Sequence, residues 1–135
     1  MKKHLAYCLP ALVLACALPI AAQAADAGGA ASKQVSTAAA HAGMALGAAD
    51  LKMAHAHLQH VVNCLVGPAG KAFDANAANP CKGMGQGAIV DAKGDAATEA
   101  RLHKALSEAE SGLKSTSLEG AHADANKAMS TLQAH

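Results

Sequence analysis

Residues 51–65 read LKMAHAHLQHVVNCL, and a related stretch, LEGAHADANKAMSTL, occupies residues 118–132. At one constant offset the two stretches share identical residues, which in the first copy are Leu51, Ala54, His55, Ala56 and Leu65. At the same offset Val35 and Ala42 correspond to Leu102 and Ala109. The repeat predicts an all-α, up-down-up-down four-helix bundle built from two tandem helical hairpins. A looser three-helix bundle with a frayed first helix is the alternative.

Apolar residues within the first stretch recur at helical spacing. At about 100° per residue, one broad arc collects the residues expected in the core, which are Leu51, Ala54, Leu58, Val61, Val62 and Leu65. A preceding helix is predicted over residues 32–49, and Asp50 is a suitable N-cap for the second helix, which Gly67-Pro68 ends.

The second half of the chain predicts two more helices. The first begins at Asp95 or Thr98, and the second begins at Ser115 or Ser117 and runs to about Gln133. Residues 32–135 therefore form one helical domain.

A long connection, residues 67–95, links the two predicted hairpins and is rich in glycine and proline. A loop of this length in a compact domain needs something that fixes it in place. Cys64 and Cys81 would do so as a disulfide, which is the simplest pairing for two cysteines in an exported chain. A pair of thiolate metal ligands is the alternative.

The N-terminus has the pattern of a secretory signal peptide over residues 1–24. Lys2 and Lys3 precede an apolar run that ends in small residues, and cleavage is expected after Ala24. The exported chain would be periplasmic or secreted, would start with a flexible segment at residues 25–31, and would contain no membrane span. A lipid anchor at Cys16 and an uncleaved membrane anchor are the alternatives.

Composition excludes several classes of function. The formal net charge is only +1, and Trp is absent, so neither a basic surface nor aromatic stacking supports nucleic-acid binding. The glycine-rich stretch at residues 83–87 follows no predicted strand and lacks the Lys-Ser/Thr of a phosphate-binding loop. We find no paired catalytic carboxylates, and we expect no enzymatic activity.

Histidines gather on one side of the second predicted helix. Met53, His57, His60 and Cys64 fall within about 60° of one another, nearly opposite the core arc. His57 and His60 are three residues apart and can bind one metal ion together.

Imidazole ligands suit Cu(II), Zn(II) and Ni(II), with copper favoured. Met53, or Met84 from the connection, would add a soft ligand for Cu(I). His55 and its repeat equivalent His122 lie at the core edge and are secondary candidates, and further ligands would come from the loop, another helix or a symmetric homodimer. The alternative is that these histidines are solvated surface residues.

The chain resembles the small metal-binding protein family, whose members are exported, Ala-rich and His-rich proteins made of helical hairpins. The resemblance covers most of residues 32–134 and rests on His41-Ala42, Ala54-His55-Ala56-His57 with His60, Leu102-His103-Lys104-Ala105 and Ala121-His122-Ala123. It implies a periplasmic four-helix bundle that binds divalent metals, copper especially, for buffering or tolerance. Because this chain has fewer histidines and adds a disulfide-tied loop, we carry over one or two sites at most. The loop block CLVGPAGKAFDANAANPC also resembles part of a family of small exported bacterial proteins without an assigned function.

Three functions are therefore open. The first is a periplasmic, non-enzymatic metal-binding protein with His57 and His60 as the central ligands. The second is a structural or interaction module of the cell envelope that presents the disulfide-tied loop, with incidental histidines. The third is a pH-responsive envelope protein, since several histidines would become charged together in mild acid.

Overall fold

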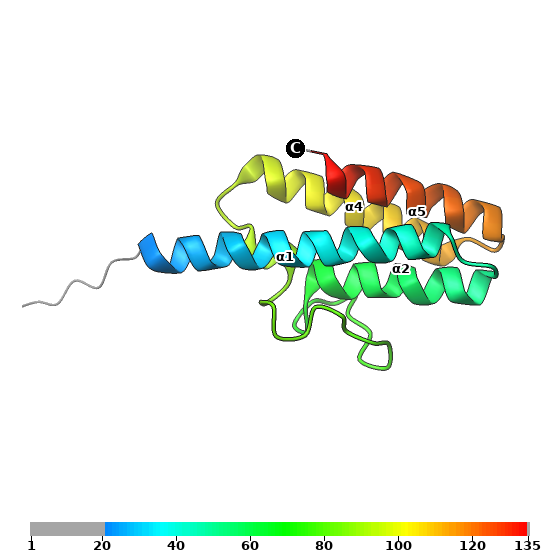
Figure 1. Cartoon of the computed structure of the whole chain (residues 1–135), viewed down its shortest axis with the longest axis horizontal. Helices are drawn as coiled ribbons and strands as arrows, with labels where there is room; N and C mark the ends of the chain where they lie inside the picture. The colour runs from blue at the N-terminus through cyan, green and yellow to red at the C-terminus, as the bar shows by residue number, and fades with distance from the viewer. Residues whose placement is uncertain (1–20, 135) are drawn as a thin grey trace, which may run out of the picture.

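The structure, a computed structural model, describes residues 21–134, with side chains from residue 28 onward. This part of the chain is all-α, as predicted, and contains no strand. Four long helices lie side by side, and a short helix interrupts the long connection (Figure 1). They are α1 (Ala21–Leu46), α2 (Leu51–Val66), α3 (Ala88–Asp91), α4 (Ala96–Lys114) and α5 (Leu118–Gln133).

Most of the predicted signal peptide, including Cys16, lies outside the described residues. Among the helices that are described, none has both the length and the apolar character needed to cross a membrane. Residues 25–31, expected to be flexible, belong to α1 in this structure. Alanine has the highest helix propensity, so helix continues through this Ala-rich segment despite Gly28 and Gly29.

The helix boundaries follow local capping chemistry. The Asp50 side chain accepts a hydrogen bond from the Met53 backbone N–H at 2.8 Å and starts α2, which ends at Gly67 with φ of 67°. Of the two caps proposed for each later helix, Asp95 caps α4 and Ser117 caps α5. Each cap satisfies a backbone donor that the first helical turn leaves without a partner.

The core is narrow because small side chains dominate it. α1 packs on α2 and α5, and α4 packs on α5 and α2. The predicted core arc of α2 is confirmed except at its first residue, since Leu58, Val61 and Leu65 are fully buried but Leu51 is only partly buried. The fully buried residues face mostly alanines, which allow close approach of helices but bury little apolar area each. The remaining fully buried core residues include Ala38, Ala42, Ala45, Leu102, Ala105, Ala109, Ala121, Ala125 and Ala128.

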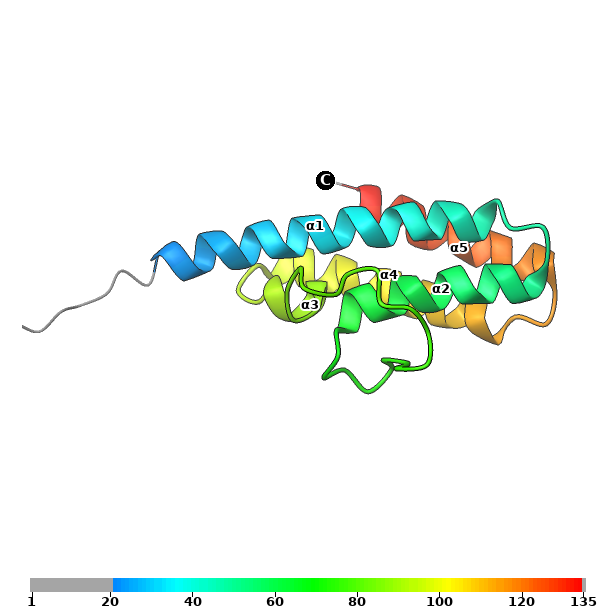
Figure 2. The same ribbon diagram turned by 60° about the horizontal axis from the view of Figure 1, so that its bottom comes forward.

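The long connection is fixed to α2, as Figure 2 shows where it loops beneath that helix. The predicted Cys64–Cys81 disulfide is present, with a Cα–Cα distance of 5.2 Å. The fully buried side chain of Asn63 adds three hydrogen bonds, because its Nδ2 donates to the carbonyl oxygens of Asp74 and Ala78 and its Oδ1 accepts from the Asp74 N–H. The connection covers this end of α2, so Cys64 is buried although it lies away from the helix core arc.

The connection then passes along α1 as α3. The Asp91 carboxylate accepts hydrogen bonds from the buried Gln34 side chain of α1 at 2.6 Å and from the Gln86 backbone N–H at 2.9 Å. Within α3, Ala88 is buried but Val90 remains 43% exposed.

Candidate metal centre

Three histidines from two helices meet where α1 contacts α2. His41 comes from α1, whereas His57 and His60 come from α2, on which a spacing of three residues places both rings on one face. The Nδ1 atom of His41 lies 3.3 Å from Nδ1 of His57 and 3.3 Å from Nδ1 of His60. One potential ligand atom from each residue lies within 4.8 Å of the other two. We call these three residues the histidine cluster.

The separations within the histidine cluster suit a bound transition metal. A tetrahedral ion with metal–nitrogen bonds of about 2.0–2.1 Å holds two ligand nitrogens about 3.3 Å apart. The two Nδ1 separations from His41 match that value, while the ligand atoms of the whole cluster lie within 4.8 Å of one another. Without a metal, an unprotonated His41 Nδ1 can accept an N–H hydrogen bond from one of the two neighbours, so the same arrangement is compatible with neutral rings.

The surroundings of His41 and His60 favour the neutral form of these two imidazoles. All three side chains are partly buried. Burial lowers the pKa of His41 below its ordinary value of 6.5, and the nearby His60 and His57 lower that pKa further. Burial, and then the charge of His57, also lower the pKa of His60. Because a metal binds the neutral ring, these effects keep two of the three ligands ready to bind near neutral pH.

Regular secondary structure holds the three rings. The short turn at residues 47–50 reverses the chain, and the Asp50 cap fixes the first turn of α2. One turn beyond His60, the Cys64–Cys81 disulfide anchors the connection. Ligands carried by helices are held more accurately than ligands on loops, so the backbone places the rings before any metal arrives.

The structure groups only two of the sequence-predicted ligands. His57 and His60 belong to the histidine cluster, whereas His55 and His122 are not in it. The Nε2 atom of His122 lies 3.0 Å from the Ala48 carbonyl oxygen, which ties α5 to the α1–α2 turn. The Nε2 atom of His55 is buried without a hydrogen-bond partner among the described residues. Met53 lies one helical turn before His57 and is 50% exposed.

His41 is the ligand that the sequence analysis left out, because it is the only histidine of its helix. The signal that would have found it is the position of the turn at residues 47–50. In an antiparallel hairpin, residues at equal distances from the turn lie opposite each other, which places residue 41 opposite residues 56–57. Folding the sequence about that turn therefore brings His41 to His57, as observed.

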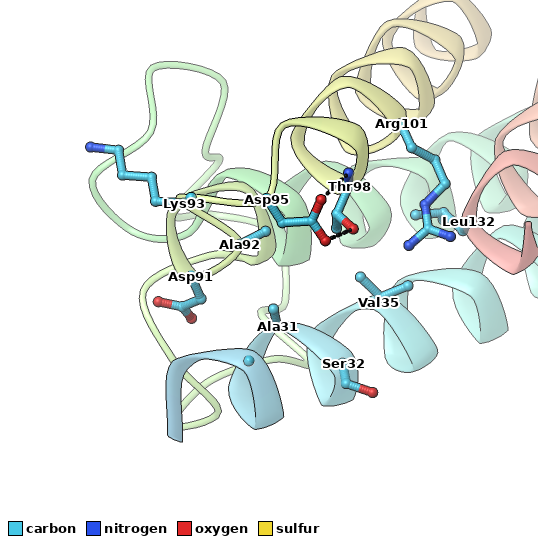
Figure 3. Close-up of a pocket in the computed structure, with 12 residues that line it drawn as sticks. Ala31, Ser32, Val35, Asp91, Ala92, Lys93, Asp95, Thr98, Arg101 and Leu132 are labelled. Carbon is cyan, nitrogen blue, oxygen red and sulfur yellow. Dashed lines mark hydrogen bonds between the residues drawn. The ribbon is translucent and has the colours of Figure 1, made fainter. Parts of the chain in front are cut away.

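A separate cavity of about 570 Å³ lies elsewhere, between the start of α1, the α3–α4 connection and Leu132 of α5. Figure 3 shows the Arg101 side chain reaching toward it from α4. The Arg101 Nε atom has no hydrogen-bond partner among the described residues, while Asp95 is engaged in capping by accepting hydrogen bonds from Thr98. The residues lining the cavity include no histidine, so it is not part of the candidate metal centre.

Comparison of the chain with family models, curated proteins and solved structures gave no match. The functional argument therefore rests on the geometry and chemistry of the histidine cluster.

Proposed function

We propose that this chain is a non-enzymatic metal-binding protein of the cell envelope, in which His41, His57 and His60 hold one divalent transition metal ion. The two Nδ1 separations of 3.3 Å are the observation that supports this most directly. They equal the spacing that a tetrahedral metal requires. The lowered pKa values of His41 and His60 add support, since they reduce competition from protons.

Copper is the metal that we favour. Imidazole suits Cu(II), Zn(II) and Ni(II), and the intrinsic affinity of nitrogen sites is highest for Cu(II). Three protein ligands leave a coordination position for water or an incoming ligand, which is typical of exchangeable rather than purely structural sites. Reversible binding of one ion per chain is suited to metal buffering or tolerance, as the resemblance to the small metal-binding protein family also suggests.

We place this function outside the cytoplasm, in the periplasm or as a secreted protein after cleavage following Ala24. The Cys64–Cys81 disulfide supports export, because such bonds persist in oxidising compartments. We further infer that the four long helices form an up-down-up-down bundle. Short connections join α1 to α2 and α4 to α5, while α1 packs on α5 and α2 packs on α4.

Calorimetric titration of the purified protein with Cu(II), Zn(II) and Ni(II) tests the proposal. We expect one ion per chain with micromolar or tighter affinity, and loss of that binding in the His57→Ala/His60→Ala variant. His103→Ala is the matched control, because His103 is exposed on α4 and outside the cluster. Binding that survives in the double variant would refute the proposal.

A second candidate function is an interaction module of the cell envelope that presents the disulfide-tied connection at residues 67–95. In its favour, the disulfide and Asn63 give this segment a defined conformation although it contains little regular structure. The same calorimetry distinguishes the two candidates, since an interaction module with incidental histidines would bind no metal stoichiometrically.

A further inference from the structure

Two methionines on the α1–α2 hairpin are unusually exposed. Three large apolar side chains of the described residues are exposed, and two of them are Met44 at 49% and Met53 at 50%. A solvent-exposed thioether contributes little to a core but remains available as a soft metal ligand.

The helical register places both methionines beside the histidine cluster. Met44 follows His41 by three residues on α1, and Met53 precedes His57 by four on α2, so each is a one-turn neighbour of its histidine. Because α1 and α2 run in opposite directions, both steps lead from the cluster toward the turn at residues 47–50. The two thioethers therefore lie on the same side of the cluster.

A third thioether, that of Met84, lies on the other side of the cluster. Its sulfur is 3.7 Å from the Oγ1 of Thr37, one turn before His41, although the single O–H of Thr37 has a nearer acceptor in the Lys33 carbonyl oxygen at 3.0 Å. Met84 is partly buried in the connection. Met44 and Met53 are more exposed than Met84, so they are the thioethers that an incoming ion can reach more easily.

We propose that Met44 and Met53, together with imidazole from the histidine cluster, bind Cu(I). This inference rests on the proposed metal-binding function and specifies the oxidation state that the adjoining ligands select. Thioether sulfur is a soft ligand that prefers Cu(I), whereas imidazole serves Zn(II) and Cu(II) as well. Divalent ions would use the three rings, and Cu(I) would use the thioethers with one or two of those rings. The ion is bound as Cu(I) and stays Cu(I), so the binding step involves no electron transfer.

Replacing the two sulfurs without changing side-chain size tests the proposal. In the full-length Met44→Leu/Met53→Leu variant, leucine keeps the apolar volume and helix propensity but removes both thioethers. Cu(I) affinity is measured anaerobically by competition with a chromogenic Cu(I) chelator, and Zn(II) affinity is measured by calorimetry. We expect Cu(I) affinity to fall at least about tenfold, the loss of roughly 1.4 kcal/mol, with Zn(II) affinity within about twofold of wild type.

Two single variants make the assignment specific. Met129→Leu removes a thioether from α5, and Met84→Leu removes the partly buried thioether of the connection. Neither substitution should change Cu(I) affinity more than about twofold. Unchanged Cu(I) affinity in the double variant would overturn the inference, as would a loss seen only with Met84→Leu. Equal losses of Cu(I) and Zn(II) would also overturn it, because the methionines would then act only through structure. Failure of the wild-type protein to bind Zn(II) or Cu(II) would instead overturn the proposed function itself.

Discussion

The His41→Ala substitution tests whether the metal site needs all three histidines of the cluster or only His57 and His60. Removing partners that merely orient a metal ligand costs about 10–100-fold in affinity. His41 is one of three proposed ligands, and its Nδ1 lies 3.3 Å from the Nδ1 atoms of the other two. We therefore expect His41→Ala to weaken Zn(II) or Cu(II) binding by at least the upper end of that range, about 100-fold.

Metal-dependent stability gives a direct readout of this change. A ligand that binds only the folded state, present at 100 times its dissociation constant, stabilises the protein by about 2.7 kcal/mol. At the same metal concentration, the variant would be at about its own dissociation constant and would gain only about 0.4 kcal/mol. Urea unfolding of each protein, with and without metal, measures both gains.

The same substitution should not harm the apo protein, because alanine is the best helix former and His41 is only partly buried. The exposed His103→Ala again serves as the control and should keep the full metal-dependent gain. If metal still raised the free energy of unfolding of the His41→Ala variant by more than about 2 kcal/mol, the contact of His41 with His57 and His60 would not define the site.

Three further predictions concern stability. Cys64→Ala/Cys81→Ala opens a loop with a sequence separation of 17 residues and should lower the free energy of unfolding by about 3 kcal/mol; a urea-unfolding loss below about 1 kcal/mol would contradict the chain-entropy argument. Asn63→Ala removes three buried hydrogen bonds to the connection and should cost about 2–4 kcal/mol, with faster amide exchange in residues 72–79 as the specific sign and unchanged exchange as the contrary result. Because the folded-state pKa values of His41 and His60 lie below 6.5, apo stability from these groups is complete above pH 6.5 and declines as the pH falls through the lower folded values. Urea unfolding between pH 7.5 and 5 should show this decline reduced in His41→Ala/His60→Ala, and an equal decline in both proteins would assign it to other groups.

Local chemistry made the fold largely predictable from the sequence. The periodicity of α2, the Asp50 cap and the Gly67 stop each depend on residues within one or two helical turns, and the structure has all three. The disulfide was predictable because only two cysteines lie beyond the predicted signal peptide. The hydrogen bonds of Asn63 were not, because they join a helix to irregular backbone whose path no periodic pattern describes.

In the candidate site, too, the part set by local helix geometry was predictable, and the part set by packing between helices was not. His57 and His60 share a helix face, so their proximity follows from α-helical geometry alone. His41 requires the register between two helices, which depends on where the turn reverses the chain and how the alanines of α1 pack on α2. His55 and His122 were candidates because they occupy equivalent positions in the repeat, which lie in different hairpins. The observed cluster instead forms within one hairpin.

All three rings of the histidine cluster come from residues 41–60, the two arms of the first helical hairpin. Contacts this local in sequence form early, because closing a short loop loses little chain entropy. The ligands therefore assemble as soon as one hairpin closes, before α4 and α5 need to dock. Under the proposed export and metal binding, a metal ion that meets the emerging chain would favour that hairpin over the unfolded chain and would act as a folding nucleus as well as a cargo.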